Sequence, residues 1–178
     1  IVVRRLAESA MFTLPFIALA ALPLLMGETG QAVFEWMHVE EVLHDPMLKA
    51  KAAYLNKSAF GARFGFYLVL WAIMCLLFWS WSRKQDTAKG ADIEKLAIKQ
   101  RYIAPIALLV FAFSMTFGAF DFMMSLDPHW FSTIFGLLMV TGQGLSALAF
   151  TIAVLSLLAA TPPFSRYLTP RHFHDLGK

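Results

Sequence analysis

Long apolar runs separated by short polar stretches dominate the chain. Four of these runs approach or exceed the roughly 20 residues that an α-helix needs to cross about 30 Å of hydrocarbon. They cover residues 7–26, 64–81, 103–124 and 131–160. The pattern predicts an all-α, polytopic transmembrane helix bundle with four spans. All of residues 1–178 form one transmembrane domain in this interpretation, with a polar tail at 161–178.

Prolines predict bends in the first span, and a capping residue predicts where the helix of the third span begins. Pro15 and Pro23 predict bends in the first span, because proline removes a backbone donor from the helix. Asp92 is expected to cap a helix that feeds the third span.

The first long connection, residues 27–62, mixes apolar side chains with acids and histidines. This mixture predicts a short amphipathic helix at the membrane interface, with Trp36 as its anchor. Asp45-Pro46 is expected to end that helix, and a second short helix is expected to run from there to Leu55.

Charge is scarce and unevenly distributed along the chain. Only 15% of the residues are charged, while 58% are hydrophobic, and the net charge is +3. The basic residues lie between apolar runs, so they indicate membrane topology rather than nucleic-acid binding. Eleven of them fall on one side of the predicted membrane and four on the other. This imbalance predicts cytoplasmic ends for the chain and a periplasmic turn at 125–130. The group of eleven is Arg4, Arg5, Arg83, Lys84, Lys89, Lys95, Lys99, Arg101, Arg166, Arg171 and Lys178, and the group of four is Lys49, Lys51, Lys57 and Arg63.

The inventory of metal ligands argues against a cofactor held by this chain alone. Cys75 is the one cysteine, so a four-thiolate iron–sulfur site cannot form. The five histidines lie outside the apolar runs, which argues against a haem between the spans. His172 and His174 are two residues apart and do not share a helix face, so a solvated tail is the better interpretation.

Asp121 is the acidic residue that lies inside an apolar run, near the end of the third span. A carboxylate at membrane depth costs about 3 kcal/mol, so it needs a partner or a function. Two interpretations stay open. Asp121 is either a proton acceptor at a quinone pocket or in a proton path, or a structural carboxylate that bonds a neighbouring helix.

Asp127 and His129 flank a proline in the turn between the third and fourth spans. Asp-Pro opens turns, and an Asp side chain bonds backbone amides two residues on. Histidine titrates near neutral pH, so it can accept a proton from a quinol at a membrane face. Turn formation and interfacial packing are the alternatives to proton transfer for these two residues.

One stretch of the chain resembles a known family. Residues 120–136, FDFMMSLDPHWFSTIFG, closely resemble a motif of the ActF-type membrane subunit of bacterial alternative complex III, a quinol:cytochrome c oxidoreductase. That subunit is related to the NrfD-like (polysulfide-reductase) membrane subunits. Shorter matches follow in order along essentially the whole chain: VVRRLAE (2–8), LPFIALAALPLLMG (14–27), KAAYLN (51–56), WSRKQD (81–86) and HFHDLGK (172–178). Because the family protein has further spans, the resemblance implies that this chain is a central fragment.

The resemblance implies an integral subunit of a respiratory or photosynthetic quinol:electron-acceptor oxidoreductase in the bacterial inner membrane. Quinone and membrane lipids are the implied small partners. Haem c and iron–sulfur clusters would belong to partner subunits: a multihaem cytochrome c, an iron–sulfur subunit and an NrfD-like paralogue. The chain would contribute quinone binding, proton transfer or scaffolding, without being catalytic alone. A proton-coupled transporter module and a purely structural membrane anchor stay open as alternatives.

Overall fold

The computed structural model describes residues 2–25, 27–162 and 164–177, and every regular element within these ranges is a helix. The first part of the chain forms α1 (Val2–Met11), α2 (Leu14–Ala21), the 3-10 helix η1 (Leu22–Leu25), α3 (Gly27–Val33), the 3-10 helix η2 (Glu35–Met37), α4 (Val39–His44) and α5 (Pro46–Lys51). The second part forms α6 (Lys57–Thr87), α7 (Ala91–Phe122), the 3-10 helix η3 (Met124–Leu126), α8 (Phe135–Leu158), α9 (Phe164–Tyr167) and α10 (Pro170–Gly177). The predicted all-α fold is confirmed.

Four helical stretches are long and apolar enough to cross a membrane, as predicted. They are Leu6–Leu25, Lys57–Thr87, Ala91–Leu126 and Phe135–Leu158. The second and third exceed the predicted ranges, because polar residues beside the apolar runs continue the helices past about 30 Å of hydrocarbon. The fourth is shorter than predicted, because residues 127–134 form turns and irregular backbone. Met26, the predicted end of the first span, and Lys178, a predicted cytoplasmic charge, lie outside the described residues.

The first span is interrupted, as its prolines predict. α1 ends at Met11 and α2 begins at Leu14, directly before Pro15. Thr13 Oγ1 donates a hydrogen bond of 2.7 Å to the carbonyl of Ala10 at the break. Around Pro23 the chain tightens into η1 rather than continuing as an α-helix. Proline's missing N–H and its ring account for both irregularities.

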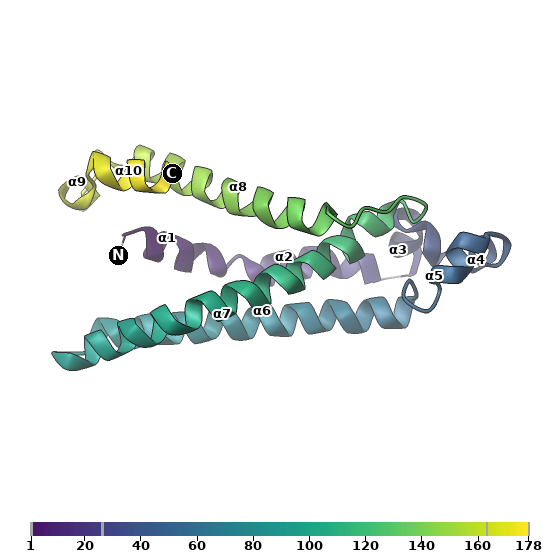
Figure 1. Ribbon diagram of the computed structural model, residues 1–178, viewed down its shortest axis with the longest axis horizontal. Helices are drawn as coiled ribbons and strands as arrows, with labels where there is room; N and C mark the ends of the chain where they lie inside the picture. The colour runs from purple at the N-terminus through teal and green to yellow at the C-terminus, as the bar shows by residue number, and fades with distance from the viewer. Residues whose placement is uncertain (1, 26, 163, 178) are drawn as a thin grey trace.

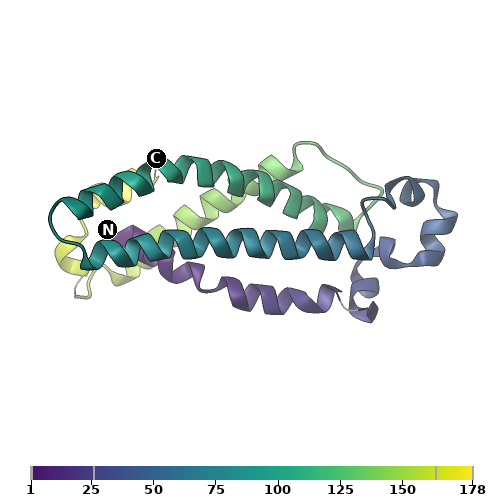
Figure 2. The same cartoon turned by 90° about the horizontal axis from the view of Figure 1, so that it is seen from below.

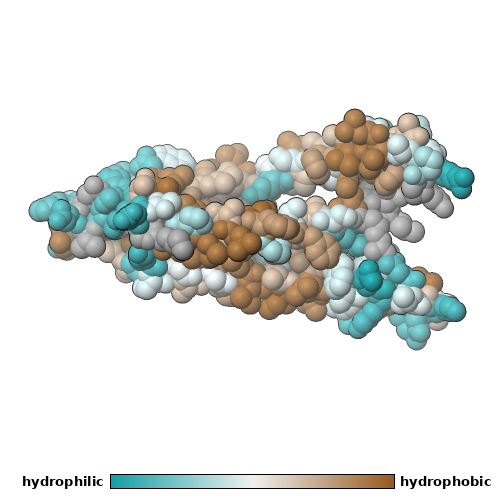
Figure 3. Space-filling model, turned by 180° about the vertical axis from the view of Figure 1, so that it is seen from behind, coloured by the Kyte–Doolittle hydropathy of each residue, from teal (hydrophilic) through white to brown (hydrophobic). Residues whose placement is uncertain are grey.

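The connections between the spans gather at two ends of the bundle (Figures 1 and 2). One end holds the start of α1, the α6–α7 turn and α10. The described residues there include ten basic and five acidic ones, a net charge of +5. The opposite end holds residues 27–63 and 121–134, with four basic and seven acidic residues and a net charge of −3. We call these the basic end and the acidic end. Hydrophilic residues gather toward both ends, while hydrophobic residues cover the middle of the face shown in Figure 3.

A small hydrophobic core closes the acidic end. It consists of Phe34, Trp36, Met37, Leu48, Leu55 and Phe60. The Trp36 ring lies 5.2 Å from the Phe34 ring and 5.3 Å from the Phe60 ring, and the residue is 4% exposed. The predicted role of Trp36 as an interfacial anchor is therefore wrong. Its large apolar area is buried within the chain's own core.

Of the two predictions about helix starts, the one at Asp45-Pro46 is confirmed and the one at Asp92 is wrong. Asp45-Pro46 does end one short helix and begin another, and Asp45 Oδ1 accepts from the amide of Met47 at 2.7 Å. The second helix stops at Lys51, before the predicted Leu55. The predicted cap of α7 is wrong, because the helix begins two residues earlier than an Asp92 cap requires and Gly90 occupies the N-cap position with φ +58°.

Candidate functional site

Asp121 lies on the last turn of α7 and is 1% exposed. Since α6 and α7 are antiparallel neighbours, the second turn of α6 brings Arg63 opposite it. Arg63 Nε donates to Asp121 Oδ1 at 3.1 Å and to Oδ2 at 3.0 Å, and Nη2 donates to Oδ1 at 2.9 Å. A forked guanidinium–carboxylate pair of this kind is the strongest hydrogen-bonded arrangement that these groups adopt.

Two tyrosines complete this arrangement. Tyr67, one helical turn after Arg63 and on the same face of α6, donates its hydroxyl to Asp121 Oδ2 at 2.7 Å. The ring of Tyr54 covers the Arg63 guanidinium, 3.8 Å from its central carbon to the ring centroid. We call Tyr54, Arg63, Tyr67 and Asp121 the Asp121 cluster. It joins the loop before α6, α6 itself and the end of α7.

The Asp121 carboxylate is fully engaged in this cluster. Both oxygens accept from Arg63, and one also accepts from Tyr67. The paired positive charge offsets the cost of burying the carboxylate. The geometry therefore favours the structural interpretation of Asp121 over its interpretation as a proton acceptor.

Tyr54 lies just before the second span, and its hydroxyl is hard to ionise. Partial burial raises the pKa of Tyr54 to about 12, and the negative charge of Asp121 adds to the shift. The hydroxyl therefore stays protonated at neutral pH and can act as a hydrogen-bond donor.

His129 forms a second, separate arrangement at the acidic end. Its Nε2 contacts Asp45 Oδ2, and its Nδ1 lies 3.9 Å from Glu35 Oε2. The hydrogen bond with Asp45 raises the pKa of His129, and the negative charges of Asp45 and Glu35 add to it. The same hydrogen bond lowers the pKa of Asp45, helped by the amide of Met47. We call His129 and Asp45 the rim pair. The His129 side chain is 45% exposed, so the rim pair can exchange protons with water.

Asp127 forms the turn that the Asp-Pro sequence indicates. Its Oδ1 accepts from the amides of His129 at 3.2 Å and Trp130 at 3.3 Å. Lys51 Nζ donates to the carbonyl of Pro128 at 2.5 Å, which ties the turn to the end of α5. These contacts fix the backbone on which His129 stands. They support the turn interpretation of Asp127.

A small pocket of about 260 Å³ lies between the loop before α6 and the connection from α7 to α8. Lys51 and Tyr54 line one side of it, and Trp130 and Phe131 line the other. The two neighbours of His129 in the chain, Pro128 and Trp130, both belong to its wall. We call it the rim pocket. It combines aromatic walls with a few polar groups, as small-molecule sites do.

The structure thus divides the three predicted site residues between two networks. Asp127 and His129 share one turn, whereas Asp121 belongs to the Asp121 cluster. All three lie at the acidic end. Sequence reasoning missed the partners Arg63, Tyr67 and Asp45. The spacing of Arg63 and Tyr67 indicates that the two side chains share a helix face, but it does not point to Asp121 as their partner, and no sequence signal points to Asp45.

Two of the other histidines, His172 and His38, take part in local contacts. His172 Nδ1 accepts from the Thr169 amide at 3.1 Å, and a ring nitrogen of His38 lies 2.9 Å from the carbonyl of Gln31. Across the described ranges, His, Cys, Asp and Glu side chains form no group of three that could hold a metal ion.

Comparison with known proteins gives no family assignment. The chain matches no protein-family model, and a search of curated proteins found no similar protein. The function is therefore inferred from the geometry and from the resemblance carried by residues 120–136.

Proposed function

We propose that the chain is a membrane subunit of a quinol:electron-acceptor oxidoreductase of the alternative complex III type. In this proposal the rim pocket receives the quinol headgroup, and the rim pair passes quinol protons to water. The observation that carries the proposal is the position of His129. It stands between two residues of the pocket wall, faces Asp45 and remains open to solvent.

The chemistry of the pocket suits a quinol ring. Trp130 and Phe131 offer aromatic faces, and Tyr54 and Lys51 offer hydrogen-bond donors. The volume of about 260 Å³ lies just below the roughly 300–1,000 Å³ typical of sites that enclose a whole drug-sized ligand. A ring fits such a space, while its isoprenoid tail extends into the lipid.

Oxidation of a quinol to a quinone releases two electrons and two protons. The electrons go to haem c and iron–sulfur clusters of partner subunits, and the protons need an acceptor at the membrane face. His129 can take a proton on a ring nitrogen and release it to water, and Asp45 stabilises the imidazolium that forms. Asp121 keeps a structural role in this scheme, because Arg63 already compensates its charge.

Charge supports one orientation of the chain. In the bacterial inner membrane, the basic end with its net charge of +5 would face the cytoplasm. The acidic end, with residues 125–130, would then face the periplasm. Protons would leave on the side where a multihaem cytochrome c accepts electrons.

A purely structural anchor is the second candidate, and the Arg63–Asp121 pair favours it. A buried pair that fixes two spans needs no redox chemistry to explain it. The transporter alternative has less support. It rests on ionisable residues at mid-membrane depth, and Asp121 is already paired near one end of the bundle.

The test replaces His129 with Ala in the assembled complex and uses His44→Ala as the matched control. His44 is also an exposed histidine of the acidic end, at the end of α4. We expect His129→Ala to lower quinol:cytochrome c activity and proton release about tenfold or more, with assembly intact. His44→Ala should leave both unchanged. Full activity of His129→Ala would favour the anchor, and purification without any redox subunit would exclude both proposals.

A further inference from the structure

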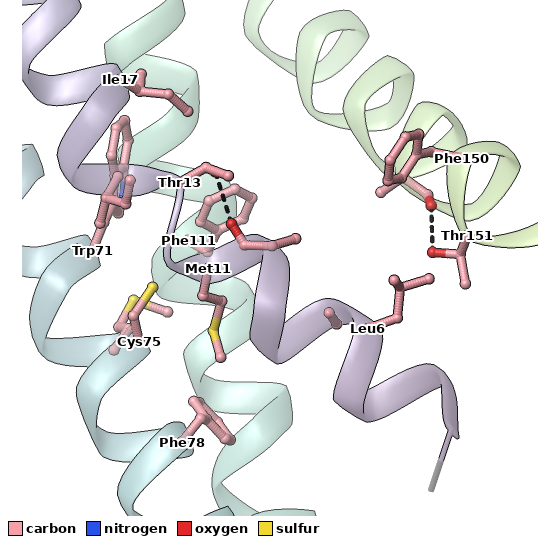
Figure 4. A pocket seen from close by; sticks show the side chains of 15 residues that line it. Leu6, Met11, Thr13, Ile17, Trp71, Cys75, Phe78, Phe111, Phe150 and Thr151 are labelled. Carbon is pink, nitrogen blue, oxygen red and sulfur yellow. Dashed lines mark hydrogen bonds between the residues drawn. The ribbon is translucent and has the colours of Figure 1, made fainter. Parts of the chain in front are cut away.

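A cavity of about 690 Å³ lies between the first span and the other three (Figure 4). α1 and α2 contribute residues from Leu6 to Ile17, α6 contributes Trp71 and Phe78, and α7 and α8 complete the wall. The volume falls well within the roughly 300–1,000 Å³ of small-molecule sites. It is far larger than the rim pocket and separate from it.

Apart from the weakly polar Cys75 thiol, the cavity wall offers hydrocarbon rather than free polar groups. Thr13 Oγ1 donates to the carbonyl of Ala10 at 2.7 Å, and Thr151 Oγ1 donates to the carbonyl of Ala147 at 2.8 Å (Figure 4). Trp71 Nε1 is likewise occupied, since it donates to Ser114 Oγ at 3.0 Å. A polar ligand would lose its water contacts here without replacing them. The cavity therefore suits an apolar chain.

The cavity occupies the half of the bundle next to the basic end. Leu6 begins the first span at that end, and the 11 helical steps from Leu6 to Ile17 rise about 16 Å. That rise is about half of the 30 Å hydrocarbon thickness. Trp71 lies at the middle of α6, and Phe78 lies closer to the basic end. The depth of the cavity thus corresponds to one leaflet.

The charge of the nearby basic end selects the kind of lipid. The basic end carries a net charge of +5 over the described residues. Arg4, two residues before Leu6, donates to Gln85 Oε1 at 2.6 Å and lies 3.3 Å from Glu8 Oε1, so the other basic side chains of this end supply the charge for a headgroup. Basic residues at a membrane surface attract anionic lipids by about 1 kcal/mol each. We propose that the chain binds an anionic phospholipid of the basic-end leaflet, with one acyl chain in the cavity and the headgroup among the basic side chains. This inference does not depend on the proposed quinol function.

The test uses tryptophan fluorescence in the full-length protein, purified with whatever subunits accompany it. This preparation is reconstituted in nanodiscs of unlabelled phosphatidylcholine. One set of nanodiscs contains a minor share of brominated phosphatidylglycerol, and the other contains the same share of brominated phosphatidylcholine. Bromine quenches tryptophan on contact, and a Trp71→Phe variant identifies the part of the quenching that comes from Trp71. We expect brominated phosphatidylglycerol to quench Trp71 at a lower lipid content than brominated phosphatidylcholine does. The difference should be about fivefold for each basic side chain that the headgroup contacts.

A pair of substitutions tests the location. Ala10→Leu with Ala147→Leu narrows the cavity from two walls and should abolish the quenching of Trp71. Ala149→Leu, on α8 but outside the cavity wall, should leave the quenching as it is. If the double variant does not fold, the comparison of the two brominated lipids in the unaltered protein still tests the proposal. Equal quenching by both lipids would overturn the proposal. So would absence of Trp71 quenching, as expected if a partner helix fills the cavity, or recovery of an isoprenoid quinone as the occupant.

Discussion

Arg63 and Asp121, 58 residues apart in sequence, form a forked ion pair in which Nε and Nη2 of the guanidinium donate to the two carboxylate oxygens. The pair joins the start of α6 to the end of α7. Because Asp121 is 1% exposed, removing Arg63 would leave a buried charge without compensation. This pair therefore holds the second and third spans together near the acidic end.

Loss of one partner of this pair should destabilise the chain. We expect Arg63→Met to cost about 3 kcal/mol, because it leaves the Asp121 carboxylate buried and unpaired. The double variant Arg63→Met, Asp121→Leu should recover most of that loss, since no buried charge remains. Reversible unfolding in detergent measures all three proteins. A single variant as stable as the parent, or a double variant that only adds further loss, would contradict the pairing.

The Tyr67 hydroxyl should contribute less than the ion pair. Tyr67→Phe removes one hydrogen bond to a charged acceptor and should cost about 1.5–3 kcal/mol. Tyr102→Phe is the matched control, because Tyr102 also lies on a long helix but is 75% exposed. The same unfolding measurement compares them. Equal stability of the two variants would show that the Tyr67 hydrogen bond does not contribute to the free energy of unfolding.

Gly136 should be the position where α8 tolerates no side chain. A Cβ atom there would collide with the Thr116 side chain of α7, at 2.9 Å from its Cβ, and the α7 backbone stands directly behind. We expect Gly136→Ala to cost about 1–3 kcal/mol by forcing the two helices apart. Gly142→Ala, on the same helix with nothing within 4 Å, should be neutral or slightly stabilising. Thermal unfolding of both variants gives the comparison, and equal effects would contradict this packing.

The rim pair should make the turn after α7 sensitive to pH. The pKa of His129 is raised in the folded chain. Its contribution to the stability of the turn is therefore complete below the unfolded-state pKa near 6.5, and it is lost as pH rises through the folded-state pKa. The pKa of Asp45 is lowered in the folded chain. Its contribution to the stability of the turn is therefore present above the unfolded-state pKa of about 4, and it is lost as pH falls through the folded-state pKa. The contact is therefore strongest between about pH 4 and 6.5.

Hydrogen exchange measures this dependence. After correction for intrinsic rates, residues 124–134 should exchange more slowly at pH 6 than at pH 9. Asp45→Asn should remove most of the difference, because the positive imidazolium loses its charged partner. Glu35, Asp127 and Lys51 also lie near the turn, so Glu35→Gln serves as the control, and its 3.9 Å separation predicts a smaller effect. An unchanged pH difference in Asp45→Asn would contradict the rim pair.

The long apolar runs were sufficient to predict the spans, but not the tertiary partners. Burial in lipid selects long apolar helices whatever their neighbours, so four spans could be identified from hydropathy alone. Asp121 could be singled out because a carboxylate at membrane depth is costly. Its partner could not be identified, because Arg63 precedes the apolar run and is also explained by membrane topology.

The acidic end was harder to predict because its contacts join segments far apart in sequence. Trp36 has the amphipathic side chain of an interfacial anchor, yet Phe34 and Phe60 bury it. Asp45 caps α5 through one oxygen and contacts His129 through the other. A local pattern shows the first role, while the second depends on how loop 27–56 folds back over the α7–α8 turn.

Photolabelling with an azidoquinone in the assembled, active complex tests the central claim most directly. The account predicts that the label, displaced by excess quinone, attaches to the rim pocket segments at residues 51–55 and 124–131. Trp130→Ala should reduce the yield there, whereas Trp81→Ala, at the other end of α6, should not. Labelling confined to a partner subunit, or to the basic end of this chain, would contradict the assignment of quinol binding to the acidic end.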